Sequence, residues 1–281
     1  MHFGVAMFPA DFAMNVADLG RAAEERGFES LFVPEHTHIP AARETPFPQG
    51  GELPREYSHT LDPFVALAAV SAVTSRIKLG TGICLVIQRD PIVMAKQVAS
   101  VDLLSGGRLL FGVGAGWNRE EIANHGVDPR VRWRVFGERM RAMQAIWTSE
   151  EASFSGRYVK FDRIWSWPKP IQKPHPPVLM GGDYEAAIER VIEFGDEWMP
   201  HPDRGAPLHQ RIADLWARSE AAGRGRLPVT IYGAASDPKV VDEYQAAGVT
   251  RCVLRIPSAP ADAVLPALDR AAEVMRQVLA A

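Results

Sequence analysis

The chain has 281 residues, of which 47% are hydrophobic and 23% are charged, and its formal net charge is −3. This balance is typical of a globular protein with a full core, and the lack of a Lys/Arg stripe speaks against a nucleic-acid partner. No apolar run reaches membrane-spanning length, and the two cysteines, Cys84 and Cys252, each lie inside an apolar run. We therefore expect a cytoplasmic protein without disulfides, signal peptide or membrane contact.

One local pattern recurs along the chain: an apolar run, a loop, an amphipathic helix and a glycine. In its first occurrence the run "HFGVAMF" precedes a helix over Asn15–Arg26 that Asn15 can cap, and Gly27 takes the left-handed conformation that ends a helix. Later, Asp237-Pro238 supplies a cap and a first-turn proline for a helix that ends at Gly248. The pattern predicts strands and helices in alternation.

About eight such apolar runs follow one another. In chain order they are "FGVAM", "LFVPEH", "IKLGTGICLV", "RLLFGVGAG", "PPVLMGG", "EWMPH", "PVTIYGA" and "CVLRI". Their near-continuous apolarity is typical of parallel strands that are buried on both faces. Eight strands that alternate with helices predict a single (β/α)8 TIM-barrel domain over residues 1–281, and a doubly wound open sheet is the alternative.

Two segments interrupt the repeat. Thr45–Thr60 is a Pro/Gly-rich loop after the second strand, and Glu151–Pro177, before the fifth strand, contains aromatic residues that suggest a small hairpin. Insertions of this length often form lids or binding walls, although either segment can also be a surface ornament. Trp165 and Trp167 would then make an aromatic wall for an apolar substrate, or else pack the hairpin itself.

The fourth run belongs to a glycine-rich stretch, "GGRLLFGVGAGWNREE". Its spacing, Gly112-x-Gly114-x-Gly116, is not the dinucleotide-binding G-x-G-x-x-G, and no clear ribose-binding acid follows it. Glycines inside a strand favour the close approach of a ligand or of another backbone. At the mouth of a barrel such a gap would accept a flat ring or part of its side chain, and tight packing is the alternative.

The fifth run ends in glycines directly before a predicted helix, in "VLMGGDYEAA". Backbone N–H groups at Gly181, Gly182 and Asp183 would favour an anion there, through hydrogen bonds and the helix dipole. The third run, "GTGICLV", is also glycine-rich. A flat ring near the third and fourth strands, with a phosphate near the fifth helix, describes a flavin-like cofactor.

Four blocks together resemble the luciferase-like monooxygenase superfamily: "PEH", "GTGICLV", "GGRLLFGVGAGW" and "WPKPIQKPHPPVLMGG". The sequence is most similar to the branch that uses the deazaflavin coenzyme F420 rather than FMN, from Phe3 to the eighth helix. The resemblance implies an active site at the carboxyl ends of the strands, a homodimer, and a separate flavin or F420 reductase as partner. With F420 the expected reaction is hydride transfer to or from a small organic substrate, and with FMNH2 it is oxygen insertion.

The resemblance also implies which residues hold the cofactor. Members of the superfamily form a bulge with a non-proline cis peptide on the third strand, here Gly82-Ile83, and a trans bond with a local bulge is the alternative. The expected cofactor contacts are Gly82, Ile83, Gly114, Gly116, Trp117, Gly181, Gly182 and Asp183.

His36 ends the second run, where deazaflavin-dependent members often place a catalytic or substrate-facing histidine. Its imidazole can pass a proton while the ring takes or gives hydride, unless it merely binds a loop carbonyl. Glu35 is a possible partner, although adjacent strand residues point to opposite faces. Phe8 and His201 end other strands and are expected to line the substrate pocket or to belong to the core.

Two other classes of function compete with this interpretation. His36-x-His38, with His59 and His201, resembles the ligands of a metal-dependent hydrolase barrel. That pair would end the first strand, whereas here it follows the second, and "RCVLRIPSAP" ends without an acid, so we expect no metal site. A non-catalytic flavin-binding barrel is the other alternative. Gly116-Trp117-Asn118 stands where some sugar-oxidising relatives carry a glutamate, which speaks against an alcohol dehydrogenase.

Overall fold

Eight parallel strands form the centre of the computed structural model, which describes residues 1–183 and 185–280. They are β1 (His2–Ala6), β2 (Ser30–Val33), β3 (Lys78–Thr81), β5 (Leu109–Gly114), β8 (Val178–Gly181), β9 (Glu197–Met199), β10 (Thr230–Ala234) and β11 (Arg251–Arg255). Neighbouring strands pair in the order β10-β11-β1-β2-β3-β5-β8-β9, and the two-residue strand β4 (Cys84–Leu85) pairs with the end of β5.

The two ends of this strand order meet. The Trp198 N–H donates to the Pro228 carbonyl at 3.0 Å, and the Tyr232 N–H donates to the Pro200 carbonyl at 3.0 Å, so β9 approaches β10. β1 lies between β11 and β2, so that the first and last strands of the chain are neighbours in the barrel. The predicted (β/α)8 barrel is confirmed, and the open doubly wound sheet is wrong.

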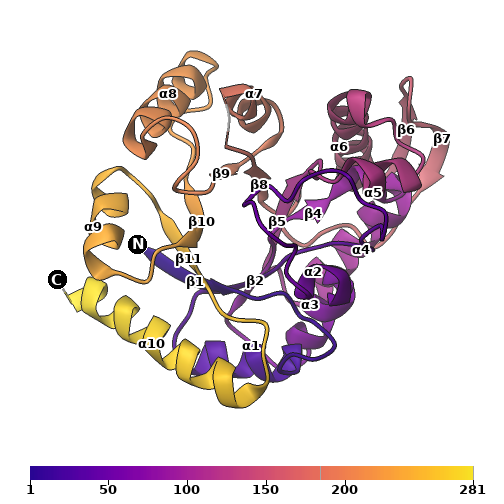
Figure 1. Ribbon diagram of the computed structural model, residues 1–281. Helices are drawn as coiled ribbons and strands as arrows, with labels where there is room; N and C mark the ends of the chain where they lie inside the picture. Colours follow the sequence, from indigo (N-terminus) through magenta and orange to yellow (C-terminus); the bar gives the residue numbers. More distant parts are fainter. Residues whose placement is uncertain (184, 281) are drawn as a thin grey trace.

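Among the described residues, a helix of nine or more residues follows each strand of the barrel, and these helices surround the strands (Figure 1). They are α1 (Val16–Glu25), α3 (Pro63–Ser71), α4 (Pro91–Leu104), α6 (Arg132–Thr148), α7 (Glu185–Phe194), α8 (Leu208–Ala221), α9 (Pro238–Ala246) and α10 (Ala261–Ala280). Among the residues that the structure describes, no helix combines the length and the apolarity needed to cross a membrane.

The predicted helix boundaries are set by local hydrogen bonds. The Asn15 side chain accepts from Ala17 N–H at 2.9 Å, and the Asp237 side chain accepts from Lys239 N–H at 2.9 Å. Gly27 and Gly248 follow their helices with φ of +84° and +97°, where a residue without Cβ is favoured.

Side chains that cross the barrel fill its interior, and glycines on the strands make room for them. A Cβ at Gly80 would lie 2.2 Å from the ring of Phe32, and one at Gly82 would lie 2.5 Å from the ring of Tyr232. The lack of a side chain at Gly80 and Gly82 therefore allows close packing inside the barrel. The interior cluster consists of Ala6, Phe32, Leu110, Leu179, Met199 and Val253, with Ile83 and Tyr232 packed against it.

A network of ion pairs closes the amino end of the barrel. Arg251, at the start of β11, donates to Glu29 at 2.9 Å and to Glu197 at 2.7 Å. Lys78 also pairs with Glu29, at 2.9 Å. Burial raises the pKa of Glu29, but the bonds to Arg251 and Lys78 outweigh burial and lower this pKa to about 2. Each buried charge at this end thus has a partner of opposite sign.

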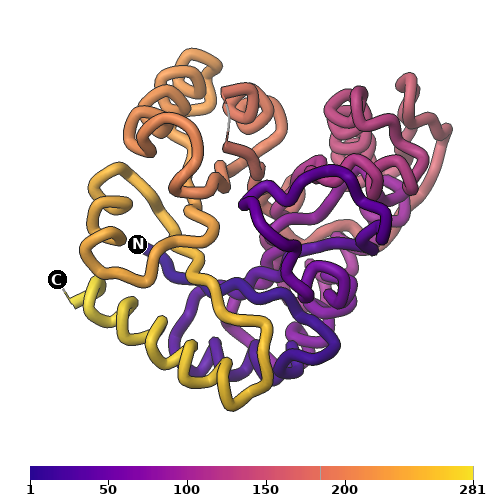
Figure 2. The backbone as a smooth tube through the Cα atoms, in the orientation of Figure 1, coloured from indigo at the N-terminus to yellow at the C-terminus, as the bar shows by residue number. Residues whose placement is uncertain are grey.

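Two excursions from the repeat occur where the sequence predicts them. The segment after β2 contains the short helix α2 (Glu56–His59) and passes over the barrel beside α5 (Arg119–Asn124), a helix that sequence analysis missed (Figure 2). The second excursion is the predicted hairpin, formed by β6 (Glu151–Ser155) and antiparallel β7 (Lys160–Trp165). Glu138 of α6 fixes its turn by accepting the Tyr158 N–H at 2.6 Å.

Candidate active site at the carboxyl ends of the strands

A buried histidine–glutamate pair lies beyond the carboxyl end of β2. His36 Nδ1 is 2.9 Å from Glu121 Oε2, and the two side chains are 5% and 1% exposed. A carboxylate only accepts hydrogen bonds, so Nδ1 carries the proton in the neutral imidazole and Nε2 is left as the basic atom. This arrangement suits a residue that takes up and releases a proton.

Helix α5 begins at Arg119, and this start places Glu121 in its first turn, where the side chain reaches His36. The Asn118 side chain caps this helix by accepting the Glu121 N–H at 3.2 Å. A glutamate three residues after a cap usually turns back to the cap's own N–H, but Glu121 turns to His36 instead. Sequence analysis missed Glu121, although the cap-to-glutamate spacing in "NREE" is the signal from which helix α5 could have been predicted.

Aromatic side chains surround the imidazole. The ring centre of His36 lies 5.2 Å from that of Tyr57 and 5.8 Å from that of Trp117. Phe8 lies 4.4 Å from Tyr57, and Phe47 lies 5.2 Å from Tyr57 and 6.0 Å from Trp117. The structure therefore brings the predicted Phe8 and Trp117 to His36. The excursion after β2 adds Tyr57 and Phe47, which sequence analysis missed.

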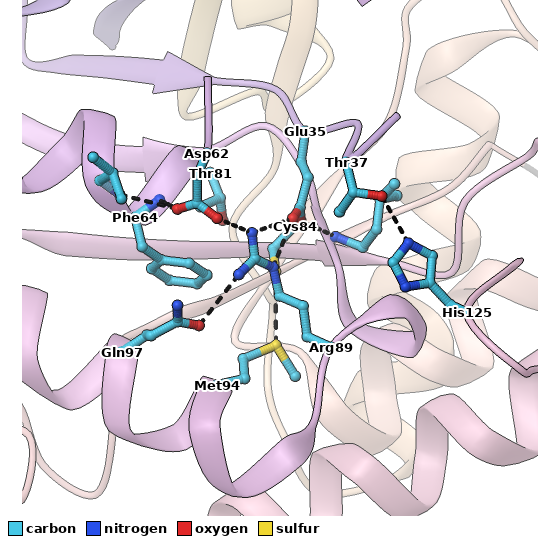
Figure 3. Close-up of polar contacts among 12 residues, drawn as sticks. Glu35, Thr37, Asp62, Phe64, Thr81, Cys84, Arg89, Met94, Gln97 and His125 are labelled. Atoms are coloured by element: carbon cyan, nitrogen blue, oxygen red, sulfur yellow. Dashed lines mark hydrogen bonds and ion pairs between the residues drawn. The ribbon is translucent and has the colours of Figure 1, made fainter. Parts of the chain in front are cut away.

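Glu35, next to His36, points the other way and has a different partner. Its carboxylate accepts the Leu85 N–H at 2.7 Å and Arg89 Nε–H at 2.6 Å (Figure 3). Arg89 also donates to Asp62, at the start of α3. Burial lowers the pKa of Arg89, but the Glu35 carboxylate outweighs burial and holds this pKa above its usual range. This network ties the end of β2 to β4 and so fixes the backbone that carries His36.

The remaining histidines do not converge on His36. Thr37 Oγ1 lies 3.0 Å from His38 Nδ1 and 2.7 Å from His125 Nε2 (Figure 3 shows the second contact). His59 lies 3.0 Å from an oxygen of Asp11. Within residues 1–183 and 185–280 no three His, Cys, Asp or Glu side chains gather as a metal site. The four histidines considered as metal ligands, His36, His38, His59 and His201, thus do not form one cluster in this part of the chain.

Ile83 lies beside Gly114 of β5 and Gly181 of β8. The peptide bond Gly82-Ile83 is cis, as predicted. A Cβ at Gly114 would lie 2.1 Å from Ile83 Cδ1, and one at Gly181 would lie 3.2 Å from Ile83 Cγ2. The predicted gap at Gly114 is thus filled by Ile83 rather than open to a ring, so Gly114 would serve a cofactor by seating Ile83. Gly116 follows with φ of +76°.

The segment between β8 and α7 is also occupied in part by the protein itself. Gly182 has φ of +134°, and its carbonyl accepts from Trp198 Nε1–H at 2.9 Å. The Asp183 carboxylate accepts the His201 N–H at 2.7 Å and an Arg204 N–H at 3.1 Å. Burial raises the pKa of Asp183, but the bonds to His201 outweigh burial and lower this pKa. The predicted anion site therefore contains a carboxylate that is balanced by Arg204, and His201 lies here rather than beside His36.

Several buried polar groups around this mouth lack a partner among the described residues. They include both amide atoms of Gln88, Asn118 Nδ2, Glu121 Oε1, and Nε and Nη1 of Arg211. Gln88 follows β4, and its Nε2 would lie 3.8 Å from a Cβ at Gly116. Unpaired buried polar groups are costly, and a polar ligand that bonds them removes the cost. Donors and acceptors of this kind fit a cofactor with a polar ring edge and a phosphate.

Trp165 and Trp167 lie elsewhere. Their exposed fractions are 75% and 57%, and they lie at and just beyond the end of β7, at the base of the hairpin, where Lys169 Nζ lies 5.2 Å over the Trp167 ring. The Trp167 carbonyl accepts from Lys96 of α4, on the outer layer of helices. Because β7 runs along the outer side of the barrel, neither indole joins the aromatic residues around His36. Trp165 and Trp167 therefore do not form the expected pocket wall with the described residues around His36.

The comparisons with known proteins agree with this architecture. The sequence profile of luciferase-like monooxygenases matches residues 5–247. An uncharacterised protein of Mycobacterium tuberculosis is 41% identical over 280 residues, which cover 97% of this chain and 98% of the relative. The FMNH2-dependent dimethylsulfone monooxygenase of Pseudomonas putida is 31% identical over 137 residues, which cover 48% of this chain and 38% of that enzyme.

A solved structure has the same fold. The coenzyme F420-dependent tetrahydromethanopterin reductase of Methanopyrus kandleri superposes with a TM-score of 0.75 at 18% identity, over 99% of each chain. The matched profile and the 41% identical relative each extend over most of the chain. The protein therefore belongs to the luciferase-like monooxygenase family.

Proposed function

We propose that the protein is an oxidoreductase that binds coenzyme F420 and transfers hydride between this deazaflavin and a small organic substrate. The observation that carries the proposal is the buried pair of His36 and Glu121, enclosed by aromatic side chains at the mouth of the barrel. A proton must move when a substrate carbon gains or loses hydride, and this pair can move it.

The chain's own groups fit a bound cofactor. Ile83 would support the ring, the Gln88 and Asn118 amides would bond its polar edge, and Arg211 would contribute charge on the side of the phosphate. When bound, the reduced ring supplies the hydride. A separate reductase would restore the reduced form. Both cysteines are buried and free, which fits the reducing cytoplasm where we place the protein.

Each residue around the imidazole has a defined task in this proposal. His36 Nε2 would accept or donate the substrate's proton, and Glu121 would hold the imidazole in one tautomer and stabilise its protonated form. Tyr57 and Trp117 would exclude water from the reacting atoms. Glu35 and Arg89 would keep the backbone of His36 in place without touching the substrate.

An FMNH2-dependent monooxygenase is the alternative, and the partial match to the dimethylsulfone enzyme of Pseudomonas putida favours it. Fluorescence titration of the purified protein with F420 and with FMN separates the two. We expect F420 to bind with Kd of about 1 μM or below, and FMN to bind about tenfold more weakly or worse. A preference for FMN would favour oxygen insertion instead of hydride transfer.

We also propose a homodimer, formed through an apolar outer face. Val65 of α3 is 67% exposed, and Val93 and Leu104 of α4 are 55% and 70% exposed. Trp165 and Trp167 continue this surface, because the Trp167 carbonyl is bonded to α4. Several exposed large apolar side chains on neighbouring elements are typical of subunit contacts. Light scattering should give twice the chain mass, and Leu104→Asp should give the mass of one chain.

A further inference from the structure

A cavity of about 360 Å³ lies on the outer flank of the barrel, where α6 and α7 face the turn of the hairpin. None of the residues that line it belongs to the candidate active site. Its volume is in the range of small-molecule sites. We call it the flank pocket, and its charge and aromatic content decide which class of ligand it suits.

The flank pocket has more positive charge than its own acids can balance. Four arginines and two glutamates line it, which leaves two positive charges in excess. Glu138 is taken up by backbone N–H groups of the hairpin turn, with Arg157 N–H at 3.0 Å and Tyr158 N–H at 2.6 Å. Glu193 pairs with Arg141. Both acids of the pocket are therefore already in use.

Arg190 is the centre of this excess charge. Its Cζ lies 3.7 Å from the ring centre of Trp133, and the Cζ of Arg132 lies 5.9 Å from the same ring. Burial lowers the pKa of Arg190, and the nearby charge of Arg132 lowers it further. Within the described part of the chain Arg190 forms no ion pair. A guanidinium stacked on an indole keeps its N–H edge free for an oxyanion.

Apolar surface lies beside these charges. Tyr158, from the hairpin turn, and Phe194, from α7, line the same pocket. Gly137 carries no side chain there, and a Cβ at this position would lie 3.3 Å from Phe194. Phe194 is buried, whereas Tyr158 is half-buried, so a flat ring can lie against Tyr158 while an anionic group bonds arginine.

We propose that the flank pocket binds a small organic phosphate with a flat ring. The phosphate would bond Arg190 and Arg157, and the ring would lie against Tyr158. A phosphate monoester carries nearly two negative charges at neutral pH, which matches the two positive charges in excess. Arginine also binds phosphate oxygens in pairs of parallel hydrogen bonds.

Isothermal titration calorimetry tests the proposal with adenosine 5′-monophosphate and with inorganic phosphate as probes. We expect a Kd of about 0.1 mM or below for the nucleotide, with inorganic phosphate weaker by about fivefold or more. Arg190→Gln should weaken nucleotide binding by about tenfold or more. The matched control is Arg276→Gln on α10, where Arg276 pairs with Glu273 at an exposed position. This control should bind the nucleotide like the natural protein.

Two further variants keep the result decisive. Arg157→Gln changes an exposed residue of the hairpin turn, so it tests the pocket even if Arg190→Gln does not fold. His36→Ala should leave nucleotide binding unchanged, because His36 lies outside the flank pocket. Equal affinity for nucleotide and phosphate, full binding by the folded arginine variants, or loss of binding in His36→Ala would overturn the proposal.

Discussion

Among the described residues, the two ends of the barrel differ in how many buried polar side chains lack a partner: Ser30 at the amino end, against Gln88, Asn118 and Glu121 at the carboxyl end. At the amino end Arg251 joins Glu29 and Glu197, and each charge has a partner. At the carboxyl end Gln88 and one oxygen of Glu121 are buried without a partner in the described chain. Paired groups hold a fold together, whereas unpaired ones are costly unless a ligand satisfies them. We therefore regard the amino end of the barrel as its structural end and the carboxyl end as its functional end.

The largest effect should come from removing the cation at the amino end. Arg251→Met would leave Glu29 and Glu197 buried without their shared partner, and breaking such a network costs about 3–5 kcal/mol. Urea unfolding measures this loss, and Arg276→Met, at an exposed pair, is the control, with an expected loss of about 1 kcal/mol or less. If the two variants were equally stable, the amino end would not be the structural end.

His36→Ala should lower activity rather than stability, in contrast to Arg251→Met. Loss of a proton-transferring group lowers turnover by about 100-fold or more, while cofactor affinity and the free energy of unfolding change little. Glu121→Gln should fall between this variant and the natural protein, because the amide still orients the ring but does not stabilise its charge. Steady-state kinetics and cofactor titration check both variants. Unchanged turnover in His36→Ala would return His36 to a structural role.

A smaller effect should appear in the pH dependence of stability. The folded-state pKa of Glu29 is lowered to about 2, so its ion pairs contribute stability at neutral pH that is lost as the pH falls from about 4.5 towards 2. Glu29→Gln should cost about 2 kcal/mol at pH 7 and flatten this part of the acid limb. Chemical unfolding at a series of pH values measures both. An unaltered acid limb would show that other carboxylates dominate.

The regular part of the molecule was predictable because its signals are local. The apolar runs and the caps at Asn15 and Asp237 gave the strands and helix starts, and two Pro/Gly-rich or aromatic segments marked the excursions. The cis peptide at Gly82-Ile83 followed from the family resemblance rather than from the residues.

The site was predicted only in part, because its irregular segments have no periodicity. His36, Phe8 and Trp117 closely follow strands and could be placed at the mouth, whereas Tyr57 comes from an excursion with no repeating pattern. The partner of a buried side chain depends on tertiary structure, which is why Glu121 was missed. An aromatic residue in an insertion does not reveal the face it occupies, and Trp165 proved to be exposed.

Amide hydrogen exchange of the whole protein, with and without coenzyme F420, tests most directly whether the carboxyl end is the functional one. We expect slower exchange on binding in residues 83–89 and 116–121, where the unpaired groups Gln88, Asn118 and Glu121 lie. Exchange around residues 28–30 and 250–252, at the amino end, should stay the same. Slower exchange at the amino end alone, or no change at the carboxyl end under saturating F420, would contradict the assignment of function to the carboxyl end.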